Sequence, residues 1–257
     1  TVVNFNTSEG TLAPAASGTV GQGSATTVLT YDWEKPSVTA TVSASALIDV
    51  DGEDFPVFNA IPVSFESGTG IFTDDFDDGD STGWTEGGTA NWNVASGEYK
   101  TASNGFAWSL NGCAAWQNYE AQVDIKRNGS LSASESVSLV LRYQNANQYY
   151  MVKVSCSSNC GGSPNDDQYV LELVNYNSAE TSLVSSSAFV FDNNEYYTLK
   201  ASASGNDLNA KFWIRSGTEP TDWDITVTDT SYSQGEIALT TDTSTTSFDN
   251  VSVTPAT

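Results

Sequence analysis

The chain has 257 residues with 9 Lys and Arg, 32 Asp and Glu and no histidine, so its formal net charge is −23. This charge makes nucleic acids and anionic membranes poor partners, because binding them depends on clustered positive charge. The lack of histidine excludes Ser-His-Asp triads and zinc sites built on histidine, whereas hydrolysis by paired carboxylates stays open.

The sequence also bears on where the protein works. No apolar run reaches the roughly 18 residues that a membrane-spanning helix needs. The chain begins at Thr1 without an initiator methionine, which indicates a mature N-terminus after signal cleavage or the start of a cut fragment. We therefore expect a secreted protein of the extracellular space or the cell surface. The acidic balance is equally typical of a salty habitat and identifies no partner.

Residues 1–25 are predicted to form an extended N-terminal arm. A strand-like run over 2–6 precedes a Ser, Gly, Ala and Thr-rich stretch that has no sustained periodicity. One interpretation is a flexible tail. The other is an arm that adds a strand, carried by Val2, Val3 and Phe5, to the sheet of a neighbouring copy. The sequence leaves both interpretations open.

Residues 26–70 are predicted to form a small β-rich segment, with strand-like runs over 26–33, 38–48 and 60–66. Residues 38–46 alternate apolar and polar side chains, as a half-buried strand does. So few strands build a thin sandwich at best, and we expect the segment to borrow packing from the second domain or from another molecule.

An acidic loop interrupts this segment. Asp49, Asp51 and Asp54 surround Gly52, and hard oxygen ligands at alternate positions suit Ca²⁺. The loop is not an EF-hand, because the position of the bidentate glutamate falls on Ala60. A solvated acidic turn and a small Ca²⁺ loop remain the two interpretations.

Residues 71–257 read as one larger domain. Apolar residues alternate with polar ones, for example at Val137, Leu139, Leu141 and Tyr143, which we assign to one face of one strand. No stretch has a helical apolar stripe, so the prediction is an all-β, two-sheet antiparallel β-sandwich of the jelly-roll type with an N-terminal β-rich extension. The predicted strands are 92–94 with 98–101, 106–110, 119–127, 136–143, 149–155, 169–175, 181–186, 196–202, 208–214, 225–229, 235–240 and 247–254.

Two stretches far apart in the sequence frame this domain. Residues 72–84 are acidic and turn-rich, and residues 248–253 form a closing strand with Asp and Asn between apolar residues. We predict that the first and last strands lie side by side, where paired carboxylates can share a cation.

Three cysteines, Cys113, Cys156 and Cys160, allow at most one intramolecular disulfide. Cys156 and Cys160 lie in a Ser, Asn and Gly-rich loop, which favours a local disulfide between them, with a bridge from Cys113 to one of them as the alternative. Glycosylation sequons begin at Asn6, Asn128 and Asn250, compatible with a secreted glycoprotein.

Several short motifs recur in the order seen in one known family. They are Asp-Asp-Phe-Asp-Asp at 74–78, Gly-Trp at 83–84, Trp-Asn-Val-Ala-Ser-Gly-Glu-Tyr at 92–99, Tyr-Glu-Ala-Gln-Val-Asp-Ile at 119–125, Leu-Arg-Tyr-Gln-Asn-Ala-Asn-Gln-Tyr-Tyr at 141–150, Tyr-Tyr-Thr-Leu-Lys-Ala at 196–201, Gly-Glu-Ile-Ala-Leu at 235–239 and Phe-Asp-Asn-Val at 248–251. Over residues 71–254 the chain resembles the laminin-G-like or concanavalin A-like jelly rolls that serve as carbohydrate-binding modules.

The resemblance implies a structural Ca²⁺ between the opening and closing strands. The candidate ligands are Asp75, Asp77, Asp78 and Asp249, because a divalent ion with flexible oxygen coordination relieves the repulsion between carboxylates on neighbouring strands. In the alternative, Asp249 shapes a strand end and residues 77–80 form a solvated turn.

A sugar platform needs exposed aromatic faces. The chain has 7 Trp and 11 Tyr, and most of the tryptophans lie in alternating strands where core packing is expected. Trp116 and Trp223 lie in loop-like stretches, and they join Tyr149 and Tyr150 as glycan-binding candidates.

Catalysis is not expected. The candidate acids are Glu120, Asp124, Glu135 and Glu172, but glycoside hydrolysis needs two carboxylates about 5 to 10 Å apart in one cleft. Glu120 and Asp124 lie four residues apart on one predicted strand, about 13 Å by strand rise, which is too far for a retaining pair.

Two functions fit the sequence. The first is a non-catalytic extracellular structural subunit that assembles with copies of itself into a surface filament or matrix, through its arm and Ca²⁺. The second is a secreted carbohydrate-binding module or lectin. A narrow preference goes to the first, because the N-terminal residues resemble an assembly arm.

Overall fold

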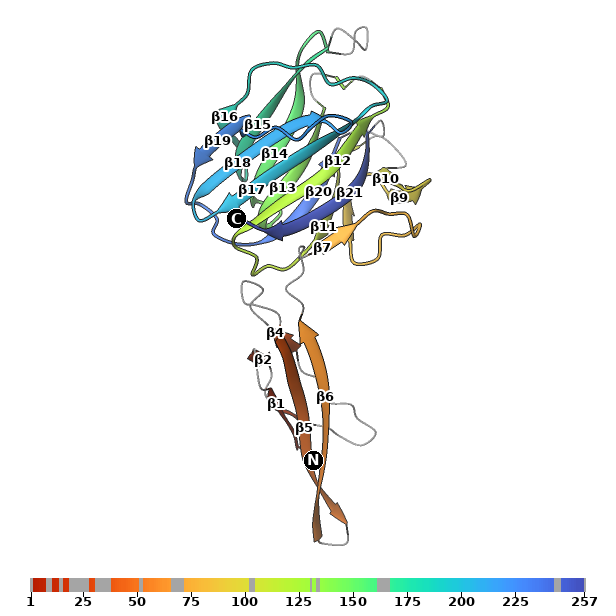
Figure 1. Ribbon diagram of the computed structural model, residues 1–257, viewed down its shortest axis with the longest axis vertical. Coiled ribbons are helices and arrows are strands. Elements are labelled where there is room, and N and C mark those ends of the chain that lie inside the picture. The colour runs from red at the N-terminus through yellow and green to blue at the C-terminus, as the bar shows by residue number, and fades with distance from the viewer. Residues whose placement is uncertain are drawn as a thin grey trace. The chain divides into compact units, whose positions relative to one another are not determined.

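The computed structural model divides into two compact units, Thr1–Thr69 and Gly70–Thr257. It describes the backbone of residues 2–7, 11–13, 16–18, 28–30, 38–50 and 53–65 in the first unit, and residues 72–101, 105–129, 131–132, 135–160, 167–242 and 246–256 in the second. The regular elements over these residues are β-strands (Figure 1), and no helix among them is long and apolar enough to cross a membrane.

The first unit contains a four-stranded antiparallel sheet in the order β3-β1-β5-β6 and a two-stranded sheet of β2 and β4. Its strands are β1 (Val2–Thr7), β2 (Thr11–Ala13), β3 (Ala16–Gly18), β4 (Val28–Thr30), β5 (Val38–Val50) and β6 (Glu53–Phe65). Strand β1, which carries Val2, Val3 and Phe5, pairs with β3 on one side and β5 on the other. Residues 2–4 of β1 are thus paired to β3 and residues 3–7 to β5 within this chain, in contrast to the free arm considered above.

Strand β6 is an edge strand of this sheet. Pro56 and Pro62 lie opposite Leu47 and Thr41 of β5. Proline has no backbone N–H to donate to an added strand, and prolines on edge strands are a common protection against edge-to-edge pairing. The β6 edge is therefore poorly suited to accept a strand from another copy.

The predicted acidic loop lies at the tip of the β5–β6 hairpin. Asp49 pairs with Asp54 across the ladder and Val50 pairs with Glu53, so the two strands run further than the sequence suggested. Asp51 and the side chains of Asp49 and Asp54 lie outside the described residues.

The second unit is a sandwich of two antiparallel sheets, whose strands form two layers in Figure 1. The predicted fold class is confirmed. One sheet has eight strands in the order β19-β18-β17-β12-β21-β10-β9, with β7 also paired to β21, and the other has seven in the order β16-β15-β14-β13-β20-β11-β8. The strands are β7 (Phe72–Asp74), β8 (Thr85–Gly88), β9 (Trp92–Ala95), β10 (Glu98–Thr101), β11 (Ala107–Asn111), β12 (Tyr119–Arg127), β13 (Ser136–Asn145), β14 (Gln148–Ser158), β15 (Gln168–Asn177), β16 (Glu180–Ser185), β17 (Tyr196–Ser204), β18 (Asp207–Ile214), β19 (Ile225–Thr228), β20 (Glu236–Thr241) and β21 (Thr246–Pro255).

The core lies between the inner faces of the two sheets. Strand β12 shows how the sequence forms it: Tyr119, Ala121, Val123 and Ile125 are fully buried, and the polar residues between them face outward. Alternation with period two is what buries one face of each strand. Because both sheets contribute such a face, each sheet also has an outer face available for function.

The opening and closing strands lie side by side, as predicted. Strand β7 pairs with β21, with Asp74 opposite Val251 and Phe72 opposite Val253. Just beyond β7, Phe76 is fully buried and stacks on Tyr99 at 4.8 Å between ring centroids. The residues that follow the opening strand are thus anchored in the aromatic core.

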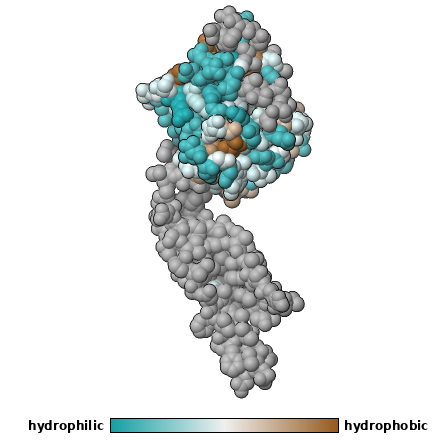
Figure 2. All heavy atoms as spheres, turned by 90° about the vertical axis from the view of Figure 1, so that its right-hand side faces the viewer, coloured by the Kyte–Doolittle hydropathy of each residue, from teal (hydrophilic) through white to brown (hydrophobic). Residues whose placement is uncertain are grey.

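Positive charge gathers on the outer face of the eight-stranded sheet. Five of the chain's nine Lys and Arg lie there, each paired with a carboxylate. They are Lys100, Lys126, Lys200, Lys211 and Arg215. Another side of the unit is seen in Figure 2, where its surface is mostly hydrophilic with one small hydrophobic patch.

Glu98 accepts hydrogen bonds from several side chains of this charged face. Burial alone would raise the pKa of its carboxyl, but hydrogen bonds from Lys126, Tyr196, Ser247 and Lys100 outweigh burial and lower the pKa to about 2. The ionised form is therefore the one that the folded state prefers.

Glu98→Gln is expected to lower the free energy of unfolding by about 1–2 kcal/mol at pH 7, since charged hydrogen bonds are lost at a partly exposed site. The pKa is depressed in the folded state, so this stabilisation is complete above the unfolded value of about 4.5 and is lost as the pH falls toward 2. Urea denaturation of both proteins at pH 7 and pH 2.5 measures it. A difference that is as large at pH 2.5 as at pH 7 would contradict the prediction.

Candidate functional site: an aromatic groove

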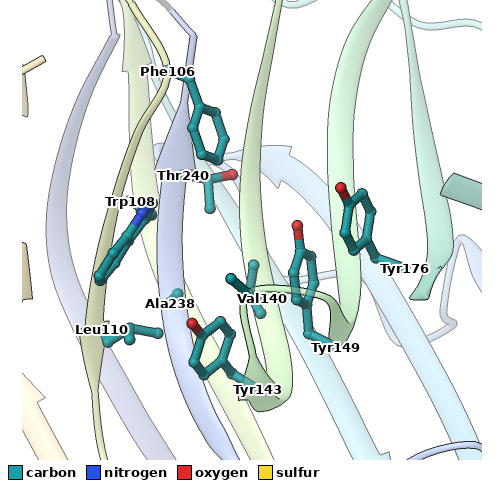
Figure 3. Close-up of a pocket in the computed structure, with 10 residues that line it drawn as sticks. Phe106, Trp108, Leu110, Val140, Tyr143, Tyr149, Tyr176, Ala238 and Thr240 are labelled. Atoms are coloured by element: carbon teal, nitrogen blue, oxygen red, sulfur yellow. The ribbon is translucent and has the colours of Figure 1, made fainter. Parts of the chain in front are cut away.

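A groove lined by aromatic side chains lies on the outer face of the seven-stranded sheet. Figure 3 shows these side chains gathered from neighbouring strands of that sheet around β20. The lining residues are Phe106, Trp108, Leu110, Val140, Tyr143, Ala146, Tyr149, Tyr176, Ala238 and Thr240.

One wall of the groove is a row of tyrosines from three neighbouring strands. Tyr143 of β13 and Tyr149 of β14 have ring centroids 5.8 Å apart, and Tyr149 and Tyr176 of β15 are 4.7 Å apart and nearly parallel. Stacked rings on adjacent strands hold one another in place. The row is thus a rigid surface.

The opposite wall comes from β11 and the residue before it. Trp108 and Leu110 alternate outward on β11, and Phe106 stands at the upper end of the groove in Figure 3 with 47% of its surface exposed. Together with the tyrosine row, these side chains form a contiguous apolar patch, and such patches often mark binding grooves.

The floor is apolar and shallow. Val140, Met151, Val174 and Ala238 form a buried cluster on this face, against which Leu110, Tyr143 and Tyr149 pack. The groove has a volume of about 120 Å³, below the 300–1,000 Å³ of typical small-molecule pockets. It suits a flat ligand that lies across the sheet better than a compact ligand that is engulfed.

A β-bulge places Tyr143 in the groove. The β13–β20 register shifts between Val140 and Tyr143, and Arg142 has a φ of +50°. Leu139 and Leu141 are buried inside as predicted, but Tyr143 lies on the opposite face, so its assignment to their face was wrong. One extra residue in a strand moves every later side chain to the other face.

The groove lining is uncharged. Burial raises the pKa of Tyr143, with a smaller contribution from Glu236, and burial also raises the pKa of Tyr149. Both phenols are therefore neutral at physiological pH, where their hydroxyls donate and accept hydrogen bonds. Apolar faces and neutral hydroxyls suit a neutral, hydroxyl-rich ligand.

The structure separates the four predicted glycan-binding residues. Tyr149 lines the groove, but Tyr150 is fully buried on the inner face, where its hydroxyl donates to Asp229. Trp116 is 7% exposed and packs against Tyr119, and Trp223 lies over Lys211 beside the other sheet. The buried rings of Tyr150 and Trp116 cannot serve as a sugar platform in this state, and Trp223 is partly buried and lies away from the groove.

Sequence reasoning missed Phe106, Trp108, Tyr143 and Tyr176. The signal that identifies Trp108 is strand parity, since it lies between the buried residues Ala107 and Ser109. Tyr176 has the same parity as Val174, which packs in the floor of the groove.

The predicted calcium ligands do not converge. Asp75 and Asp78 line an open depression beside the β7–β21 seam, and each accepts a hydrogen bond from a backbone N–H two residues on. No group of three His, Cys, Asp or Glu side chains that suits a metal occurs in the part of the chain that the structure describes. Burial raises the pKa of Asp249, with smaller contributions from Asp124 and Asp77.

One of the candidate calcium ligands, Asp249, is instead ion-paired to Arg215. The Nε of Arg215 lies 3.2 Å from Asp124 and its Nη1 lies 3.4 Å from Asp249, so one guanidinium bridges carboxylates on neighbouring strands. The guanidinium offsets the repulsion between Asp124 and Asp249, but it makes no ion pair with Asp75, Asp77 or Asp78. These residues do not fit a calcium site.

Each of the four carboxylates considered for glycoside hydrolysis has a hydrogen-bond or ion-pair partner outside the groove. Glu120 pairs with Lys200, Glu172 pairs with Lys153, and Glu135 accepts from the backbone N–H of Ser132. Asp124 accepts from the hydroxyl of Thr198 at 2.6 Å and the amide of Asn250 at 3.1 Å. None of the four lines the groove.

The predicted disulfide joins Cys156 and Cys160, and Cys113 is free and exposed. Asn128 is exposed just after β12 and its side-chain amide donates to the hydroxyl of Ser247, and the side-chain amide of Asn250 donates to Asp124. Asn6 lies on β1, and its side chain is outside the described residues.

Comparison with known proteins identifies the fold. No protein-family model and no curated protein matches the sequence. Among solved structures, the carbohydrate-binding module CBM66 from Bacillus subtilis is similar with a TM-score of 0.52 and 19% identity, over 67% of this chain and 96% of that one.

Two further structures have the same architecture. The exoplasmic/lumenal domain of VIP36 in its Ca²⁺/Man2-bound form matches with a TM-score of 0.51 and 11% identity, over 70% of this chain and 86% of that one. A xylan β-1,4-xylosidase from Bacillus halodurans C-125 matches with a TM-score of 0.52 and 11% identity, over 84% of this chain and 51% of that one. These likenesses support the jelly-roll β-sandwich fold of the second unit.

Proposed function

We propose that this protein is a secreted, non-catalytic carbohydrate-binding module, and that the aromatic groove of the seven-stranded sheet binds a neutral glycan. The observation that carries the proposal is the groove itself, where a tyrosine row faces Trp108 and Phe106 over an apolar floor. Sugars present apolar C–H faces together with hydroxyls, which pair with aromatic rings and phenol groups.

Binding suits the site better than assembly does. CBM66 and the mannose-bound VIP36 domain are carbohydrate-binding structures by their titles, and both share this fold. Assembly by strand addition needs a free strand or a free sheet edge. Strand β1 pairs with β3 and with β5, and the edge strand β6 contains Pro56 and Pro62.

The test is binding of neutral oligosaccharides to the full chain. Xylo-, manno-, cello- and malto-oligosaccharides are titrated calorimetrically against the wild type, Trp108→Ala and Tyr149→Ala. Each substitution is expected to weaken binding about tenfold or more, because buried aromatic anchors carry most of a binding energy.

Trp223→Ala is the matched control, since this tryptophan lies over Lys211 and away from the groove. It is expected to leave affinity unchanged within about twofold. The proposal fails if the wild type binds no neutral glycan, or if Trp223→Ala weakens binding as much as Trp108→Ala.

A further inference from the structure

One carboxylate lies at an end of the groove. Strand β20 runs along its floor, and Ala238 and Thr240 line it. Glu236 lies two residues before Ala238 and so shares its face of the strand. It is paired directly with Tyr143 across the β13–β20 ladder. Glu236 and Thr240 are about 13 Å apart along the strand, and the small residue Ala238 lies between them on the same face.

Glu236 is partly buried without a partner. In the part of the chain that the structure describes, no side chain or backbone N–H is hydrogen-bonded or ion-paired to its carboxylate, and burial is the cause that raises its pKa. At the other side of the same face, Glu172 and Glu180 both pair with Lys153. A desolvated carboxylate without a donor costs stability, and a ligand that supplies donors recovers it.

We propose that Glu236 is the hydrogen-bonding anchor of the groove and that it selects neutral sugars with two adjacent free hydroxyls at that end. The two carboxylate oxygens accept one hydrogen bond from each hydroxyl, while the sugar lies beside the ring of Tyr143. The remaining sugars of a linear oligosaccharide extend along β20 over Ala238 toward Thr240 and Phe106. This inference rests on the proposed glycan binding and names the residue that gives it specificity.

The test compares Glu236→Gln with Glu120→Gln in the full chain, using the oligosaccharide from the panel above that the wild type binds best. Glutamine keeps the shape and removes the charge, so Glu236→Gln is expected to lower affinity about tenfold to a hundredfold. Its urea midpoint is expected to stay equal or rise, because an unpaired buried charge is removed. Glu120, on the opposite sheet, pairs with Lys200, and its substitution is expected to leave affinity unchanged within about twofold.

A fully O-methylated form of the same oligosaccharide, which has no hydroxyl to donate, is expected to bind the wild type and Glu236→Gln equally weakly. Unchanged affinity of Glu236→Gln for the unmodified sugar would overturn the anchor and leave glycan binding standing. A lower urea midpoint would assign Glu236 a structural role instead. A wild type that binds no neutral oligosaccharide would overturn both proposals.

Discussion

Arg127→Met is expected to lower the free energy of unfolding of the jelly-roll unit by about 3–5 kcal/mol, because it leaves a buried carboxylate without its cation. Arg127 is fully buried at the end of β12. Its Nη1 lies 2.9 Å from the carbonyl oxygen of Gly129 and 3.8 Å from Asp167, and its Nε donates to the carbonyl of Phe191 at 3.1 Å. The guanidinium also lies over the ring of Tyr169.

Urea denaturation followed by tryptophan fluorescence measures this loss, since six of the seven tryptophans lie in the jelly-roll unit. The matched control is the double variant Arg127→Met with Asp167→Leu. Replacing both members of a buried pair by apolar residues is often close to neutral, so the double variant is expected to recover a large part of the loss. A single variant that loses less than about 1 kcal/mol would show that water reaches the pair.

The fold could be predicted because its causes are local. Period-two alternation marks nearly every strand of the jelly-roll unit, and the acidic opening with its distant Asp-Asn partner predicted the β7–β21 seam. The four-residue spacing of Cys156 and Cys160 likewise predicted their disulfide. Each of these signals is carried by neighbouring residues or by one pair of motifs.

The groove could not be predicted in the same way, because it depends on which face each strand buries. Tyr149 and Tyr150 are adjacent in the sequence, yet one lines the groove and the other is buried in the core. Alternation shows that two such residues face opposite ways but not which way each faces. The β13 bulge then moves Tyr143 across the sheet, and no local pattern marks that extra residue.

The four candidate calcium ligands are not gathered into one group in the part of the chain that the structure describes. The calcium prediction located the opposed carboxylates near the seam but could not foresee that Arg215, at the end of β18, bridges Asp124 and Asp249. Arg215 is brought to these carboxylates only by the folding of the chain. The sequence of residues 72–84 and 248–253 therefore gives no sign of this ion pair. The groove proposed above to bind a glycan lies on the opposite sheet.

Gly235→Ala is expected to cost about 3 kcal/mol or more of stability and to weaken glycan binding, because this glycine supports the β13 bulge. Gly235 has a φ of +142°, and a Cβ placed there would lie 2.5 Å from the carbonyl carbon of Arg142 and 2.5 Å from the carbonyl oxygen of Tyr143. These are backbone atoms that cannot rotate away. The bulge would have to shift, and with it Tyr143 and the neighbouring Glu236 of the groove.

Gly205→Ala is the control that separates the cost of the steric clash at Gly235 from the cost of a positive φ angle. Gly205 has a φ of +55° in the turn between β17 and β18, but no heavy atom lies within 4 Å of the position its Cβ would take. It is expected to cost only about 1–2 kcal/mol and to leave binding unchanged. Urea midpoints and calorimetric titrations of both variants measure the two effects. Equal losses of stability in the two variants would show that the clash at Gly235 adds no cost, and wild-type affinity in folded Gly235→Ala would show that the bulge does not hold Tyr143 in the groove.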